Sequence, residues 1–146
     1  MIKPSVLLVD DETAFVETLA KRLGKRDVRA TTAFSGPEAL EKLADDGAAR
    51  TDVVVLDVKM PEMDGLETLA RIKQAHPLIE VIMLTGHATV ETAIEGMKLG
   101  AFDYLMKPCE LDVLLEKVVA AATKKDEHES RILEARASLI SLRRGD

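Results

Sequence analysis

Apolar and polar residues follow two different patterns along this chain. Continuous apolar runs, such as residues 6–9 and 53–56, are typical of strands buried on both faces of a parallel sheet. Longer stretches, such as residues 13–23, carry apolar side chains every three or four positions, which indicates amphipathic helices. The pattern predicts strands at residues 6–9, 28–33, 52–56, 80–84 and 101–106, each followed by a helix.

Five strand–helix units within residues 1–123 predict an α/β protein with a doubly wound, five-stranded parallel sheet. Local signals mark where helices begin and end. Residues 35–38, Ser-Gly-Pro-Glu, resemble a capping box with an early proline, and Gly24 and Gly100 follow two of the helical stretches.

The C-terminal tail has a different pattern. It is polar just after Lys124, and apolar residues then recur at heptad spacing, in phase with the preceding helix through Lys125 and His128. We therefore expect a domain at residues 1–123 and an extended C-terminal helix at residues 124–146. That helix either continues without a break or has a hinge near Lys124.

Composition and charge exclude several classes of function. Only 3% of the residues are aromatic, which argues against a stacking platform for single-stranded nucleic acid. The net charge of −6 argues against direct nucleic-acid binding through bulk charge. Cys109 is the only cysteine, so no disulfide can form within the chain, and the apolar runs are too short to cross a membrane. We expect a cytoplasmic protein that does not enter a membrane.

Polar residues follow the predicted strands where each one ends. Asp10 and Asp11 follow the first strand, Asp57 follows the third, and Thr85 and Lys107 end the fourth and fifth. In open parallel sheets, ligands bind beyond the carboxyl ends of the strands, so these side chains should converge. Each one alone has an ordinary interpretation, such as a helix cap for Asp11 or Asp64, but their joint placement indicates a site.

The chemistry of this cluster follows from its charges. Carboxylates held close together repel one another, and a divalent cation such as Mg²⁺ relieves the repulsion with oxygen ligands. A carboxylate can also attack a phosphoryl group to form an aspartyl-phosphate, with a lysine and a hydroxyl group stabilising the charge. The sequence therefore predicts phosphoryl chemistry with Mg²⁺ as cofactor.

Four segments together resemble the response-regulator receiver domains of two-component signalling over about residues 5–122. They are Val-Leu-Leu-Val-Asp-Asp-Glu at residues 6–12, Val-Val-Leu-Asp-Val-Lys-Met-Pro at 54–61 followed by Asp-Gly at 64–65, Leu-Thr-Gly-His at 84–87, and Gly-Ala-Phe-Asp-Tyr-Leu-Met-Lys-Pro at 100–108. The resemblance implies a flavodoxin-like (βα)5 fold with strand order two-one-three-four-five. It also implies a signalling switch that is not a turnover enzyme.

The resemblance also implies roles for individual residues. Asp57 is similar to the aspartate that accepts a phosphoryl group from a histidine kinase or phosphotransfer protein. Asp10 and Asp11 match the acidic pair that binds Mg²⁺ with Asp57, and the backbone carbonyl of Lys59 would be a further ligand. Lys107 matches the lysine that contacts the phosphate, and it precedes a proline whose peptide bond is typically cis in this family.

Further roles concern switching and the lifetime of the phosphoryl group. Thr85 and Tyr104 are similar to the switch pair, in which the hydroxyl moves toward the phosphate and the ring swings inward to reshape the surface for a downstream protein partner. Lys59 and His87 lie beside the expected phosphate position and are candidates for tuning hydrolysis. For His87, a solvated loop residue is the competing interpretation.

Three functional hypotheses remain open at the level of sequence. The chain is a stand-alone switch, the receiver part of a longer transcriptional regulator, or a phosphatase of the haloacid-dehalogenase type. The phosphatase would need Asp-x-Asp after the first strand, where this chain has Asp-Asp-Glu at residues 10–12. In the tail, Ile132, Leu139 and Leu142 are candidates for self-association into a homodimer, and the tail could instead be a linker.

Overall fold

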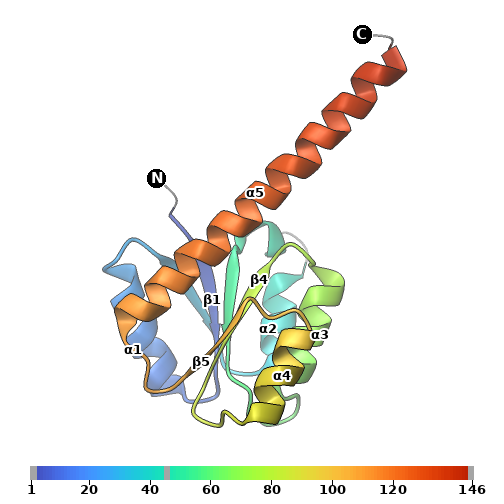
Figure 1. Cartoon of the computed structure of the whole chain (residues 1–146). Helices are drawn as coiled ribbons and strands as arrows, with labels where there is room; N and C mark the ends of the chain where they lie inside the picture. Colours follow the sequence, from blue (N-terminus) through green and yellow to red (C-terminus); the bar gives the residue numbers. More distant parts are fainter. Residues whose placement is uncertain (1–2, 45–46, 145–146) are drawn as a thin grey trace.

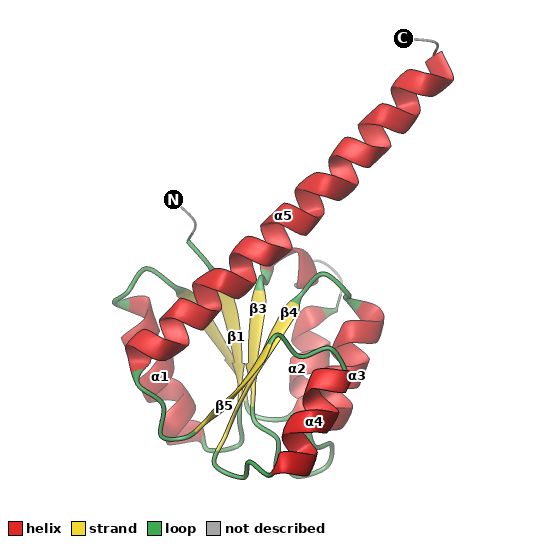
Figure 2. Ribbon diagram, in the orientation of Figure 1, coloured by secondary structure: helices red, strands yellow, loops and turns green. Residues whose placement is uncertain are grey.

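The computed structural model describes residues 3–44 and 47–144 of the chain. Within them, a five-stranded parallel sheet is covered by helices on both faces, which confirms the predicted doubly wound α/β class (Figure 1, Figure 2). The described elements are β1 (Ser5–Val9), α1 (Thr13–Gly24), β2 (Arg29–Ala33), α2 (Gly36–Leu43), the short 3-10 helix η1 (Ala48–Arg50), β3 (Val53–Leu56), α3 (Gly65–Ala75), β4 (Glu80–Thr85), α4 (Val90–Lys98), β5 (Asp103–Met106) and α5 (Leu111–Arg144).

The strands lie in the order β2-β1-β3-β4-β5, as the family resemblance implies. All four strand pairs are parallel, so the carboxyl ends of the strands share one edge of the sheet. The chain moves outward from β1 to β2 and then crosses back to β3 on the other side of β1. In such a sheet this reversal between β1 and β3 opens the crevice in which ligands bind.

The core has two layers, one on each face of the sheet. On one face, side chains from alternate strand positions pack against α1 and α5, through residues such as Leu23 and Val118. On the other face, the remaining strand positions pack against α2 and α3, through residues such as Leu43 and Ile72. Continuous apolar strands are therefore required, since each strand residue faces one layer or the other.

The predicted signals at helix ends are present. The Ser35 hydroxyl accepts a hydrogen bond from the Glu38 N–H at 3.2 Å, and the Glu38 carboxylate accepts one from the Phe34 N–H at 2.8 Å. Three strands, predicted to start at residues 28, 52 and 101, start later, at residues 29, 53 and 103. Val28 donates its N–H to Leu23 at the end of α1, and Ala101 donates its N–H to Gly96 of α4, so both still complete the preceding helical turn.

The last helix, α5, is continuous over 34 residues, so the structure shows the unbroken form rather than a hinge near Lys124. Its first part packs on the sheet through Leu114, Val118 and Ala121. The remainder projects away from the sheet on the side where the N-terminus lies (Figure 1). No helix in the described part of the chain has both the length and the apolar character needed to span a bilayer.

Two lysines of α5 form ion pairs with the sheet at the point where the helix leaves it. The Lys124 ammonium lies 3.3 Å from the buried carboxylate of Glu80, at the start of β4. The Lys125 ammonium lies 3.4 Å from Asp52, just before β3, and also pairs with Glu129. Lys125 is only 7% exposed, so its stem contributes packing as well as charge. The polar residues that interrupt the heptad pattern, Lys124 and Lys125, therefore attach α5 to the sheet.

We expect Lys125→Ala to lower the free energy of unfolding by about 1 kcal/mol, because it removes a shielded ion pair and a packed stem. Arg131→Ala is the matched control, since Arg131 is exposed on the projecting part of α5. Urea denaturation followed by circular dichroism measures both variants. Equal stability of the two would show that the Lys125 contacts contribute nothing to the fold.

Candidate functional site

The backbone places Asp10 and Asp57 side by side, each one residue beyond the end of its strand. The Asp10 N–H donates to Ala33 at the end of β2, at 3.2 Å. The Asp57 N–H donates to Val9 at the end of β1, at 3.0 Å. The pairing of parallel strands thus continues past their ends and brings the Asp10 and Asp57 side chains to one edge of the sheet.

Three carboxylates meet at this edge. Asp10, Asp11 and Asp57 each offer one oxygen, and these oxygens lie within 4.8 Å of one another. Asp10 and Asp57 are 4% and 2% exposed, whereas Asp11 faces solvent. One Asp10 oxygen accepts the Glu12 N–H at 3.0 Å, which holds its orientation. These are the three carboxylates that the sequence predicted to converge.

Lys107 supplies the opposing charge. Its ammonium donates to Asp10 at 2.5 Å, lies 3.3 Å from Glu12 and lies 4.0 Å from Asp57. Burial alone would lower the pKa of Lys107, but the hydrogen bond and negative charge of Asp10 outweigh it and raise that pKa. Lys107 therefore carries a full positive charge between the carboxylates. The peptide bond from Lys107 to Pro108 is cis, as the family resemblance implies.

The groups around the Asp57 carboxylate shift its pKa in opposite directions. Its Oδ1 accepts the Val58 N–H at 2.8 Å, and the fully buried Thr85 hydroxyl group also hydrogen-bonds to Asp57. Burial raises the pKa of Asp57, and the charge of Asp10 raises it further. The Thr85 hydrogen bond, the Lys107 charge and the Val58 N–H act in the opposite direction but do not cancel the rise. Ionised Asp57 is thus held at a cost that a bound cation would relieve.

A hollow of about 410 Å³ opens above these residues. Its walls include Asp11, Asp57, Lys59 and His87, so both tuning candidates border it. Lys59 is exposed, and the His87 N–H donates to the Thr85 hydroxyl at 3.0 Å. The His87 backbone therefore helps to orient Thr85, a contact that its sequence position alone did not predict.

Tyr104 lies farther away, on the same face of the sheet as Thr85. Thr85 pairs with Met106 and Met83 pairs with Tyr104, so the two switch candidates are diagonal neighbours on adjacent strands. The Tyr104 hydroxyl hydrogen-bonds to the Thr92 hydroxyl of α4 at 2.8 Å, and its ring lies against Gly96. Tyr104 therefore connects β5 to α4 in this structure.

The tail candidates are remote from this edge. Ile132, half-buried, and Leu139 and Leu142, 51% and 75% exposed, lie on the projecting part of α5. That part leaves the sheet at the amino ends of the strands, whereas the carboxylates lie at the carboxyl ends (Figure 1). The structure thus brings together the residues of the predicted site and leaves the tail separate.

Two contacts at the site were not predicted from the sequence. The Phe15 ring of α1 lies beneath Lys107, with the ammonium 4.2 Å from the ring centroid, although helical spacing assigned Phe15 only to the core. Gly65 passes so close to Asp57 that an added Cβ would lie 1.9 Å from the Asp57 carbonyl oxygen. Asp64 is the cap of α3, accepting the Glu67 N–H at 2.9 Å, as its ordinary interpretation predicts.

Comparison with known proteins agrees with this geometry. A family model for the response regulator receiver domain matches residues 6–119. The DNA-binding transcriptional regulator NtrC of Escherichia coli K12 is 37% identical over 124 residues, which cover 85% of this chain and 26% of NtrC. The transcriptional regulatory protein ZraR of the same strain is 41% identical over 118 residues, 79% of this chain and 26% of ZraR. The chain thus spans about a quarter of the length of these curated relatives.

Solved structures of receiver domains are also similar to this chain. A response regulator receiver domain protein from Clostridium thermocellum superposes with a TM-score of 0.80 at 34% identity, covering 84% of this chain and 97% of that one. The receiver domain of NtrX from Brucella abortus superposes with a TM-score of 0.73 at 32% identity, covering 81% of this chain and 98% of that one.

The raised pKa of Asp57 has a consequence for stability. In the unfolded chain this carboxyl ionises near its ordinary pKa of 3.8, and in the folded protein its pKa is higher. The free energy of unfolding therefore falls as the pH rises above 3.8, and the full loss is reached above the pKa of the folded state. We expect Asp57→Asn, without metal, to raise the free energy of unfolding near neutral pH. The gain should shrink as the pH falls toward 3.8.

Thermal or urea unfolding between pH 7 and pH 4 measures this difference. Asp64→Asn is the control, since asparagine caps a helix as well as aspartate does and little change is expected. A gain for Asp57→Asn that stays constant across this range would rule out the titration of Asp57 as its cause.

Proposed function

The chain belongs to the response regulator receiver domain family, and from this membership we propose that Asp57 accepts a phosphoryl group from a histidine kinase or a phosphotransfer protein. The observation that carries the proposal is the placement of one buried carboxylate, Asp57, between the Lys107 ammonium and the Thr85 hydroxyl group. A phosphorylation-dependent signalling switch needs such a nucleophile with positive charge beside it.

The transfer step uses these groups in distinct roles. An Asp57 oxygen attacks phosphorus, a P–O bond forms, and the P–N bond of the donor phosphohistidine breaks with its electron pair passing to the imidazole nitrogen. The Val58 N–H holds Asp57 Oδ1, which orients the carboxylate. Lys107 and Thr85 lie where they can donate to phosphoryl oxygens. Lys59 and His87, at the border of the hollow, would tune how fast water removes the group.

Mg²⁺ fits the residues of this site. Three converging carboxylate oxygens are hard ligands, and Mg²⁺ usually takes one or two carboxylates together with waters and phosphate oxygens. Asp10, Asp11 and Asp57 would hold the ion with the backbone carbonyl of Lys59. A bound ion would supply charge neutralisation, and it would offset the burial of Asp57 and the repulsion from Asp10, which both raise the pKa of Asp57.

Switching would pass from the phosphoryl group to the surface of α4 and β5. Thr85 moves toward the phosphoryl oxygens, and Tyr104 exchanges its hydrogen bond with Thr92 for a position closer to β4. Large apolar side chains are exposed on this surface, at Val90, Ile94, Met97 and Met106, between 48% and 72%. Such a patch supports its use in docking a downstream protein.

The tail supports two versions of this function. As a stand-alone switch, the receiver of residues 1–123 carries an extension at residues 124–146 that forms a homodimer. As part of a longer transcriptional regulator, the same helix is the linker to an output domain. The chain covers 26% of NtrC and 26% of ZraR, and this share does not distinguish between the two versions. A cytoplasmic location is consistent with both.

The family membership also bears on the enzymatic alternatives. We propose that the protein assists its own phosphorylation and dephosphorylation and does not turn over a separate substrate. A haloacid-dehalogenase-type phosphatase would place its nucleophile in Asp-x-Asp after β1, and here Glu12 occupies the second acidic position and faces solvent. Asp10, which precedes it, is already paired with Lys107.

Labelling with a small phosphodonor or with beryllofluoride, read by intact-protein mass spectrometry, tests the acceptor. One equivalent should be incorporated with Mg²⁺ and essentially none without it. Asp57→Ala should abolish the signal, because no other carboxylate in the site is held in the same way. Asp64→Asn should incorporate the full equivalent, and equal incorporation in Asp57→Ala would refute the assignment.

Self-association through the tail is tested by light scattering of the full chain. Leu139→Gln combined with Leu142→Gln should shift the mass from dimer toward monomer at micromolar concentration, since both side chains lie on the heptad stripe. Ala137→Gln, exposed on the opposite side of α5, should leave the mass unchanged. A monomeric wild-type chain would contradict the dimer and favour the linker.

A further inference from the structure

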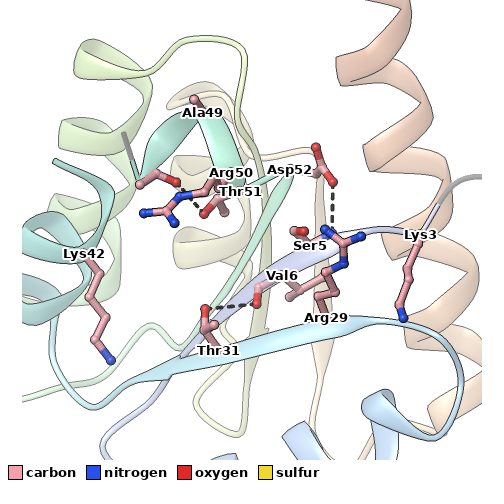
Figure 3. A pocket seen from close by; sticks show the side chains of 11 residues that line it. Lys3, Ser5, Val6, Arg29, Thr31, Lys42, Ala49, Arg50, Thr51 and Asp52 are labelled. Atoms are coloured by element: carbon pink, nitrogen blue, oxygen red, sulfur yellow. Dashed lines mark hydrogen bonds between the residues drawn. The ribbon is translucent and has the colours of Figure 1, made fainter. Parts of the chain in front are cut away.

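A second hollow lies at the end of the sheet opposite the carboxylates. It has a volume of about 730 Å³ and lies between the amino ends of β1 and β2, α2 and the segment that contains η1 (Figure 3). Ser5 at the start of β1 and Asp52 before β3 line it, so it is separated from Asp57 by the length of the strands. It is therefore distinct from the site described above.

The polar lining follows from an uncovered corner of the sheet. Leu7 of β1 and Ala33 of β2 face the core on the α2 and α3 side. Side chains alternate along a strand, so Ser5, Arg29 and Thr31 face the same side. Ser5 pairs with Arg29 and Leu7 with Thr31, which sets these polar groups next to one another on adjacent strands. The helices of this face leave them uncovered.

Among the described residues that line this hollow, positive charge predominates, although the chain as a whole is acidic. Four cations come from separate segments: Lys3, Arg29, Lys42 and Arg50. Figure 3 shows Lys3 and Lys42 on opposite sides of the hollow, with Arg29 and Arg50 between them. Within the described residues, Lys3 and Arg29 make no ion pair, whereas Lys42 lies 3.3 Å from Glu38. Lys3 and Arg29 therefore offer the charge on which an anion would depend.

Asp52 is the acidic residue among the described lining, and its charge is already matched. One of its oxygens accepts the Ser5 N–H at 2.9 Å, and the other lies 3.4 Å from the Lys125 ammonium of α5. Its carboxylate is therefore directed toward the chain rather than toward an incoming ligand. Thr31 and Thr51 add hydroxyl groups that already bond to the carbonyls of Val6 and Gly47 and so are fixed in position.

We propose that this hollow binds a small anion carrying a polyphosphate chain. Lys3 and Arg29, the two lining cations that make no ion pair with the described residues, come from separate segments, which suits a ligand with more than one charged group. The Arg29 guanidinium offers paired N–H donors that match phosphate oxygens, and a lysine binds phosphate as a point charge. The volume lies within the range of small-molecule sites.

Titration of the full chain with sodium tripolyphosphate, and separately with ATP, tests the proposal. Mg²⁺ is left out, because polyphosphate chelates it and because the carboxylate site is proposed to bind it. Calorimetry should give saturable one-to-one binding. Amide NMR shifts should map to residues 5, 29, 31 and 51. Tighter binding of ATP would assign the ligand to nucleotides, and equal binding would assign it to the polyphosphate chain alone.

Lys3→Gln combined with Arg29→Gln should weaken binding by about tenfold or more, which is the loss of at least 1.4 kcal/mol of charge-assisted contact. Lys21→Gln combined with Arg136→Gln removes the same charge from exposed positions elsewhere and should leave binding within about twofold. Circular dichroism checks that both variants are folded. Equal weakening by the two pairs, no saturable binding, or shifts confined to residues 57–59 and 85–87 would overturn the proposal.

Discussion

The parallel direction of all the strands is the constraint on which this structure depends. Because every strand of the described sheet points the same way, their carboxyl ends form one edge and their amino ends form the other. Asp10, Asp57 and Lys107 come from sites far apart in the sequence and meet only because each follows a strand at the first edge. The same constraint collects Ser5, Arg29 and Asp52 at the second edge. A single topological feature thus produces two separate clusters of polar groups.

At the first edge, charge balance rather than shape defines the site. Two nearly buried carboxylates repel each other, and the Lys107 ammonium, itself lying over Phe15, offsets part of that repulsion through Asp10. The Lys107 ammonium is 4.0 Å from Asp57, and burial together with the charge of Asp10 keeps the pKa of Asp57 raised. Of the two buried carboxylates, the one proposed as nucleophile is therefore the less neutralised. A bound cation would offset its negative charge.

At the second edge, α5 links the sheet to the part of the chain that projects from it. Lys124 and Lys125 bind Glu80 and Asp52 at the amino ends of β4 and β3, so the direction in which the helix leaves is tied to the two central strands. Asp52 also borders the cationic hollow. The projecting helix and the hollow therefore share one carboxylate, while the phosphoryl chemistry takes place at the far ends of the same strands.

Sequence by itself determined the elements and the identity of the chemical groups. Apolar runs gave the strands because burial on both faces requires them, and Asp57, Thr85 and Lys107 could be named because they follow those runs. It could not predict the ring of Phe15 beneath Lys107, the approach of Gly65 to the Asp57 carbonyl, or the attachment of Lys125 to Asp52. Periodicity reports which face of an element is buried, but not what lies opposite. Those contacts join residues distant in the chain, so only the packing of the folded layers decided them.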